Sequence, residues 1–217
     1  SVGATAGAND ASNAMAVTST DLIGRDLASR KASVGSFSVT SDFALGNEQQ
    51  RIGGTTVAAT ATGDVHLDVV TNTIGTSNLT LSGNNLSATG SGNNASNALS
   101  MSATNISQAS LGLASEQSLD AGTSVTSTTT GSIMMTGGAA TDSALSAANN
   151  TIKSTALGNL VTNTLTATAS NFTGPTSSTV TAAATSATTS VAADFAIANK
   201  QINDSTSDIK AETFGTV

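Results

Sequence analysis

The stretch SVGATAGANDASNAMAVTSTDL (residues 1–22) recurs as NLSATGSGNNASNALSMSATNI (85–106) and as TIKSTALGNLVTNTLTATASNF (151–172). Aligning the three copies places Val2, Leu86 and Ile152 at one position along the motif. It also superposes Asn13, Asn97 and Asn163. Such self-similarity is typical of proteins in which each repeat packs on its neighbours and none buries its apolar face alone. The sequence therefore predicts a repeat array.

Two shorter motifs follow the long one, always in the same order. The first reads DFALGNEQ (42–49), SLGLASEQ (110–117) and DFAIANKQ (194–201). The second reads TTVAATATG (55–63), TSVTSTTTG (123–131) and SDIKAETFG (207–215). Three motifs that keep one order divide the chain into three modules, at residues 1–84, 85–150 and 151–217.

The modules differ in length. Module one carries an insertion near residues 24–41 and module three carries one near 174–193, whereas module two has none. Module three is incomplete, because Val217 stands at the position equivalent to Val65 in module one. The chain starts at Ser1 without a Met or a charged and then apolar leader, which indicates a mature, processed start.

Apolar side chains alternate with Ser, Thr and Asp in every motif. The alternating sets are Met15 and Val17; Phe37 and Val39; Val65, Leu67 and Val69; Leu79 and Leu81; Leu99, Met101 and Ala103; Leu165, Ala167 and Ala169; and Ile209 and Ala211. A period of two predicts half-buried strands, and abundant Ser and Thr favour strands too. We expect an all-β fold, a β-solenoid or β-helix-like stack built from the three repeats.

The connections are less certain than the strands. The dipeptides Asn-Gly and Asp-Gly, which are typical of tight two-residue hairpin turns, are both absent. Their absence favours wound rungs with broad corners over tight hairpins. DFALGNEQ has consecutive apolar positions and fits either a short helix or a corner. DLIGRDLASRK (21–31) also has helix-like spacing. The single proline, Pro175, lies in the second insertion, where a turn or an exposed edge is expected.

Composition excludes several classes of protein. The chain is 38% hydrophobic and only 10% charged, with a mean hydropathy of +0.07, so it is unlike a disordered chain. Aromatic residues make up 2%, which predicts a thin core. No apolar run approaches the roughly 20 residues of a membrane-spanning helix. The net charge is −7 and the seven basic residues form no long stripe, which argues against nucleic acid as a partner.

Catalytic chemistry lacks its usual residues. There is one His, no Cys, no Tyr and a scattered set of 14 acids, so we expect neither an enzyme nor a cofactor. Asp64, His66 and Asp68 would share one face of a strand, which makes a shallow metal site conceivable. A solvated strand face is the favoured interpretation, and we predict no metal site.

Two sets of polar residues recur in phase. Gln49, Gln117 and Gln201 follow Glu48, Glu116 and Lys200. A position that accepts both Glu and Lys is structural rather than catalytic, and we expect a corner whose amide satisfies backbone groups. Asn13, Asn97 and Asn163 would stack in superposed coils and bond as an amide ladder. Ordinary turn asparagines are the open alternative.

The strand motif represented by NNASNAL (93–99), followed by alternating Ser, Thr and Ala, resembles the β-strand-repeat proteins of bacterial cell surfaces. These include holdfast-anchor proteins and, more distantly, curlin-like fibre subunits, although the Gln-x-Gly spacing of curlin repeats is absent here. The resemblance covers most of the chain. It implies secretion, an extracellular or cell-surface location, and a role in adhesion or matrix.

These observations predict a structural subunit of an extracellular filament. The first and last segments are ordinary repeats without polar caps, so each copy should accept the next one and grow a helical homopolymer. The expected junction residues are Val2, Ala4, Ile209, Ala211, Phe214 and Val217. A cell-surface anchor or a polysaccharide matrix is a further expected partner. Whether one terminus crosses into the neighbouring copy is left open.

A monomeric protein is the alternative. It would be a β-solenoid adhesin passenger, or an ice-binding protein that presents a flat face of threonine hydroxyls. The threonines that alternate in this way are Thr60 and Thr62, Thr126 and Thr128, and Thr164, Thr166 and Thr168.

Overall fold

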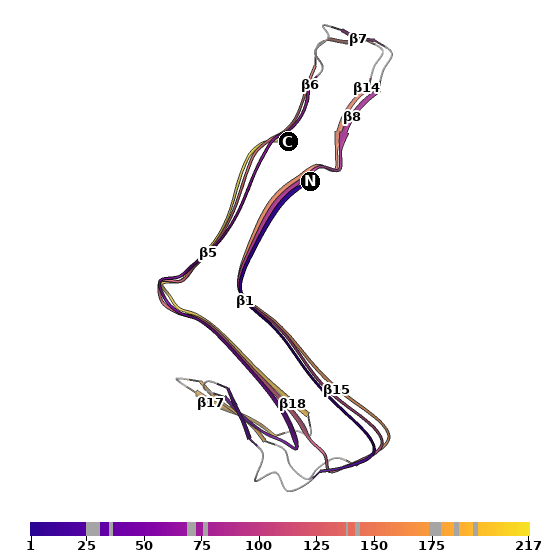
Figure 1. The fold of residues 1–217 in the computed structure, drawn as a ribbon, viewed down its shortest axis with the longest axis vertical. Helices are drawn as coiled ribbons and strands as arrows, with labels where there is room; N and C mark the ends of the chain where they lie inside the picture. Colours follow the sequence, from indigo (N-terminus) through magenta and orange to yellow (C-terminus); the bar gives the residue numbers. More distant parts are fainter. Residues whose placement is uncertain are drawn as a thin grey trace.

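The computed structural model describes residues 1–24, 31–34, 37–68, 73–75, 78–137, 139–141, 144–173, 179–184, 187–192 and 195–217. These residues form strands joined by turns and bends, and none of them is helical. The fold is all-β, as predicted, and its parallel sheets stack in a way that is compatible with a β-solenoid. Figure 1 shows an elongated, flattened molecule in which two walls run side by side.

The first wall, called the long wall below, is a parallel sheet of three long strands. These are β1 (Val2–Ile23), β9 (Asn85–Ser107) and β15 (Thr151–Thr173), with β9 in the centre. The chain leaves each long strand at one end of the molecule and returns along the other side (Figure 1). One long motif therefore supplies one strand of this wall.

The opposite wall consists of two parallel sheets, each with three strands. One contains β4 (Phe43–Arg51), β10 (Leu111–Leu119) and β18 (Phe195–Asn203). The other contains β5 (Thr56–Thr62), β11 (Ser124–Thr130) and β19 (Asp208–Phe214). In both sheets the strand from the middle of the sequence lies at the centre.

Beyond this wall, three parallel pairs complete the end of the molecule that is uppermost in Figure 1. They are β6 (Val65–Asp68) with β12 (Ile133–Thr136), β7 (Thr73–Gly75) with β13 (Ala139–Thr141), and β8 (Asn78–Ser82) with β14 (Ala144–Ala148). We call β1 and β4–β8 the first layer, β9–β14 the second layer, and β15, β18 and β19 the third layer.

The layers pair residue by residue at the positions that the motifs align. Leu86 lies opposite Val2 on one side and opposite Ile152 on the other. Gln117 lies between Gln49 and Gln201 in the same way. Because the pairing is parallel and in register, side chains of like type form columns that cross the three layers.

Strand β4 corrects one sequence-based alternative. DFALGNEQ is neither a helix nor a corner, because Phe43–Arg51 is a continuous strand paired with β10. Its consecutive apolar residues fit a strand because elements pack on both faces of this sheet: the long wall on one and β2 and β3 on the other. Within DLIGRDLASRK, Asp21, Leu22 and Ile23 belong to β1, while 25–30 lie outside the described residues.

The two insertions meet in a separate antiparallel sheet. Module one supplies β2 (Lys31–Val34) and β3 (Phe37–Thr40), and module three supplies β16 (Thr179–Ala184) and β17 (Ala187–Ala192). The strand order is β17-β16-β3-β2, so β3 and β16 join the first layer to the third. Strands β2 and β3 also contact β10. Pro175 lies outside the described residues.

The inward-facing side of the long wall changes phase along each strand. Leu86, Ala88 and Gly90 are buried at even positions, whereas Asn93, Ala95 and Asn97 are buried at odd ones. Gly92 marks the change, since it is missing from the pairing register with both neighbouring strands. A Cβ on Gly92 would lie 2.5 Å from the Gly158 carbonyl oxygen, which leaves no room for a side chain. The three strands break their pairing at the same position without an extra residue in any of them, and the long wall bends in Figure 1.

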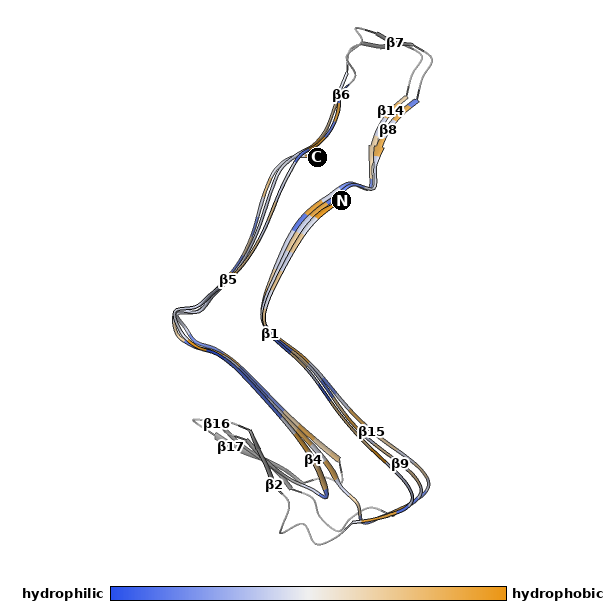
Figure 2. Cartoon of the chain, in the orientation of Figure 1, coloured by the Kyte–Doolittle hydropathy of each residue, from blue (hydrophilic) through white to orange (hydrophobic). Residues whose placement is uncertain are grey.

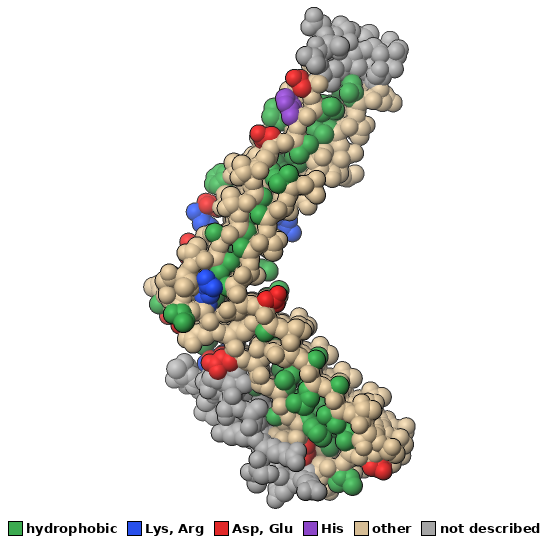
Figure 3. Space-filling view, in the orientation of Figure 1, with side chains coloured by type: hydrophobic (Ala, Val, Ile, Leu, Met, Phe, Trp, Pro, Cys, Tyr) green, Lys and Arg blue, Asp and Glu red, His purple; other side chains and the backbone are tan. Residues whose placement is uncertain are grey.

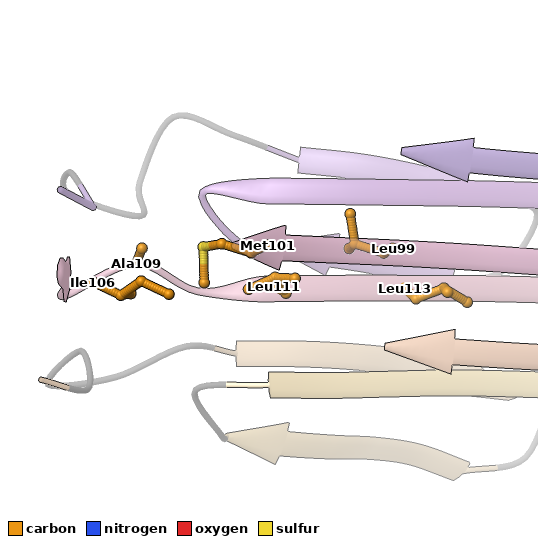
Figure 4. Close-up of a cluster of buried hydrophobic side chains, with 6 residues drawn as sticks. All are labelled: Leu99, Met101, Ile106, Ala109, Leu111 and Leu113. Carbon is orange, nitrogen blue, oxygen red and sulfur yellow. The ribbon is translucent and has the colours of Figure 1, made fainter. Parts of the chain in front are cut away.

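The apolar core is thin and lies between the walls. Hydrophobic and hydrophilic residues are interspersed along both walls (Figure 2). One apolar cluster comprises Leu99, Met101, Ile106, Ala109, Leu111 and Leu113, all in the second layer (Figure 4). Smaller clusters form around Leu86 with Ala59 and around Leu119 with Val125. Figure 3 looks along the stack, and apolar side chains follow a line between the walls. The second layer is buried because it alone has a layer on both sides.

The position of a residue in the stack should therefore decide its contribution to stability. Leu99 is 1% exposed, and its neighbour in the same column, Leu165, is only partly buried. Leu99→Ala should lower the free energy of unfolding by about 2–5 kcal/mol, and Leu165→Ala should lower it by clearly less. Chemical denaturation followed by far-UV circular dichroism measures both. Equal losses for the two variants would contradict a core that is centred on the second layer.

Candidate functional site

Columns of amide side chains run through the stack between the two walls. Asn97 is buried, and its Nδ2 donates to Asn163 Oδ1 at 2.8 Å. Asn13 Nδ2 donates to Asn97 Oδ1 at 2.9 Å. The amide ladder predicted from the sequence is present, and these three asparagines lie within strands, so the turn alternative is wrong.

A second asparagine column lies four residues earlier on the same three strands and was not singled out from the sequence. Asn9 Nδ2 donates to Asn93 Oδ1 at 2.7 Å, and Asn93 Nδ2 donates to Asn159 Oδ1 at 2.7 Å. The same Nδ2 groups also reach the opposite wall: Asn93 donates to the Ser118 carbonyl at 2.9 Å. The column therefore ties layers to each other and wall to wall. Its signal was available, because Asn is invariant at this position of the three copies.

The glutamine column has the predicted partners but not the predicted place. Gln117 Nε2 donates to Gln49 Oε1 at 2.7 Å and to the Leu160 carbonyl at 2.9 Å. These residues lie inside strands, so the expected corner is wrong, while the expected bond to the backbone is observed. Gln201 Nε2 continues the column by donating to Gln117 Oε1 at 3.1 Å. The glutamine amides therefore form a ladder between parallel strands and do not lie at a corner.

One column carries charge. Glu48 and Glu116 are direct neighbours, and Lys200 is the next residue along. Lys200 Nζ lies 3.0 Å from Glu116 Oε1, with both side chains largely buried. Like charges directly opposite each other destabilise a sheet, whereas opposite charges stabilise it. The lysine in the third layer therefore offsets the repulsion that a third Glu would add.

The predicted junction residues fall on opposite edges of the stack. Val2 and Ala4 lie on β1 in the first layer, and Ile209, Ala211 and Phe214 lie on β19 in the third, with Val217 beyond its end. Val2, Phe214 and Val217 are exposed. Within the described residues, β1 and β15 each pair on one side only, with β9. The structure does not bring the predicted junction residues of β1 into contact with those at the third-layer edge.

The polar side chains of β6 and the preceding Asp64 make hydrogen bonds to residues of the second layer. His66 Nε2 and Thr136 Oγ1 are 2.9 Å apart, and Thr136 Oγ1 donates to Asp68 Oδ1 at 2.8 Å. Asp64 Oδ1 accepts from the Ser132 backbone N–H at 2.6 Å. Among the residues described by the structure, no three His, Cys, Asp or Glu side chains are placed to share a metal ion.

The threonine face is interrupted in the third layer. Thr60 and Thr128 point outward in one column, and Glu212 takes the next position. Lys210 Nζ lies 2.7 Å from Glu212 Oε1, and this hydrogen bond and the carboxylate charge raise the pKa of Lys210. Thr164, Thr166 and Thr168 are exposed on β15. A flat hydroxyl array thus does not extend across all three layers on this wall.

A corner in the third layer depends on an acid. The Thr206 backbone N–H and hydroxyl donate to Asp204 Oδ1 at 3.0 and 2.9 Å, and these two bonds lower the pKa of Asp204. The first and second layers instead use glycines with positive φ, Gly54 and Gly122, at this corner. A lowered pKa contributes stability above the ordinary aspartate pKa and loses it as the pH falls through the lowered value.

Similarity to other proteins adds nothing to these columns. No protein-family model matches the chain, and neither a curated protein nor a solved structure matches it. In the part of the chain that the structure describes, no helix has the length and apolarity of a membrane span.

The centre of the asparagine column should be sensitive to truncation. Asn97→Ala removes the partners of Asn13 Nδ2 and Asn163 Oδ1 within a buried region. We expect a loss of about 1–3 kcal/mol in the free energy of unfolding. Ser96→Ala, at the exposed neighbouring position, is the matched control and should change little. Denaturation midpoints that coincide for the two variants would show that the column contributes no stability.

Proposed function

We propose that this chain is a structural subunit of an extracellular filament, and that copies assemble by β-strand addition at the open edges of the stack. The observation that carries the proposal is that the same columns reach both edges and end there. Edge strands offer unpaired backbone N–H and C=O groups, which are a template for another strand. Added strands then gain main-chain hydrogen bonds, while alternate side chains set the register.

Apolar exposure at the edges supports this proposal. Val125 in the second layer is 0% exposed, whereas Ile209 in the same column of the third layer is 37% exposed. Leu113 is likewise 0% exposed and its column neighbour Ile197 is 46% exposed. A further layer would cover these side chains, and burial of apolar area is favourable by roughly 25 cal/mol per Å².

The two edges differ, so their contact would propagate. The first layer presents Val2, Ala4 and Glu48, and the third presents Ile209, Phe214 and Lys200. A contact between two different surfaces continues indefinitely unless its rotation closes a ring. A filament is therefore the expected product, a helical homopolymer whose only required partner is another copy of the chain.

An extracellular place and an adhesive or matrix role rest on composition. Low charge and abundant Ser, Thr, Asn and Ala resemble the surface β-strand-repeat proteins of bacteria. A cell-surface anchor or a polysaccharide matrix is the partner that such a filament would meet. No catalytic role is included in the proposal.

Filament formation is tested with a matched pair of lysine variants. The wild-type chain should form filaments in negative-stain electron microscopy. Thr166→Lys, on the outward face of β15, should leave them intact. Ile209→Lys places a charge in a column that assembly would bury, so it should give discrete particles with the circular dichroism of the wild type.

The alternative function makes the opposite prediction for the wild type. A monomeric adhesin passenger or an ice-binding protein would remain a discrete particle at every concentration tested. That result for the wild-type chain would overturn the filament proposal. Filaments that Ile209→Lys leaves unchanged would overturn assembly through the open edges.

A further inference from the structure

We infer that copies join with one polarity and one register: the β15, β18 and β19 edge of one copy meets the β1, β4 and β5 edge of the next. This inference rests on the filament proposed above and specifies its junction. The register continues the internal one, so Ile152 meets Val2, Asn163 meets Asn13, and Lys200 meets Glu48 of the next copy.

The direction of the amide columns favours this polarity. Asn13 donates to Asn97 and Asn97 donates to Asn163, so each Nδ2 points toward the third layer. A copy added there presents Asn13 Oδ1 to Asn163 Nδ2, and the column continues without a reversal. In a contact between two third-layer edges, the Nδ2 donors of both edges would instead point at the junction.

The glutamine column gives an independent reason for the same register. Gln49 Nε2 donates to the Asn94 carbonyl at 2.9 Å, and Gln117 Nε2 donates to the Leu160 carbonyl at 2.9 Å. Each amide thus bonds the backbone one layer further along. Asp10 precedes Asn94 and Leu160 in this position of the long wall. In the inferred junction, Gln201 donates to the Asp10 carbonyl of the next copy.

A buried donor in the first layer fits the same contact. Asn47 Nδ2 is buried and has no hydrogen-bond partner among the described residues. Asn47 shares a column with Ser115 and Asn199. The inferred register places the amide of Asn199 from the preceding copy beside Asn47, and a rotation of the Asn47 amide would bring its Nδ2 within reach of Asn199 Oδ1. Buried polar groups without partners are uncommon in folded proteins.

Charge complementarity favours a contact between unlike edges. Lys200 of one copy meets Glu48 of the next, and Glu48 adjoins Glu116, so the column reads Glu, Glu, Lys through every junction. A contact between two first-layer edges would join two surfaces that both carry Glu48, and one between two third-layer edges would join two surfaces that both carry Lys200. Like charges directly opposite each other are destabilising.

The shared breaks in pairing also restrict the register. The long wall bends at Ala8, Gly92 and Gly158, and neighbouring strands stack only where their bends coincide. A slip of two residues keeps inward side chains inward but separates the bend of one copy from that of the next. The inferred junction instead sets Gly158 beside Ala8, as Gly92 already lies between the two inside one copy.

A charge swap tests the pairing of Lys200 with Glu48. Lys200→Glu should slow filament elongation at low salt by roughly tenfold, because it creates a row of three acids through each junction. Adding Glu48→Lys restores a pair of opposite charges across the junction and should recover the wild-type rate within about threefold. Recovery by the double variant supports the pairing, whereas a double variant as slow as Lys200→Glu overturns it.

Disulfide trapping tests the register, and the chain contains no native cysteine to interfere. Ala14 and Thr164 are exposed on the same face and share a column with Ala98. Adjacent strands are about 4.8 Å apart, which is within disulfide range, so a chain with both Ala14→Cys and Thr164→Cys should oxidise to a covalent ladder of multimers. The control, Ala16→Cys with Thr164→Cys, is offset by two residues at roughly 8 Å and should not.

The outcomes separate the register from the proposed function. Ladders from the in-register pair alone, resolved on non-reducing gels, support the inference. Filaments in which the offset pair oxidises instead, or in which Thr164→Cys alone gives covalent dimers, overturn the register while the filament proposal survives. No filaments and no ladder from any variant overturn both.

Discussion

Parallel, in-register pairing places like residues beside like, and the rest of the structure depends on this constraint. In every column that crosses the layers, a side chain must be able to pack beside side chains of its own type. Amides do so well, because each donates with one atom and accepts with another, as Asn97 and Gln117 do in both directions. Carboxylates do so badly, since like charges repel. This accounts for a chain that is rich in Asn, Ser, Thr and Ala and only 10% charged.

The same constraint makes the interior partly polar. Two close walls leave little room for large side chains, so the buried positions alternate between short apolar clusters and amide columns. Asn93 and Gln117 are as buried as Leu113, yet their donors and acceptors are satisfied. The amides therefore hold the layers in register while the apolar clusters hold the walls together. An edge at which such columns end presents both amide hydrogen-bonding groups and apolar side chains. It therefore suits the addition of another copy.

The sheet made from the insertions is antiparallel and joins the first layer to the third. Strand β16 pairs with β3 across the level of the second layer, which has no insertion of its own. A second-layer insertion would occupy the space in which these strands meet. Because β2 and β3 contact β10, the sheet covers part of the outer face of the central strand. The different lengths of the modules thus have a structural consequence.

The sequence by itself determined the strands, their register and one amide column, because repetition and a period of two are local properties that survive folding. Aligning Asn13, Asn97 and Asn163 was enough to place them side by side. The second asparagine column needed no more information, only attention to Asn9, Asn93 and Asn159. Tertiary structure alone decided that DFALGNEQ is a strand, that the break in pairing at Gly92 reverses which residues face inward, and that the two insertions pair. Each of these depends on what packs against the segment. The periodicity of a segment does not indicate which distant parts of the chain pack against it.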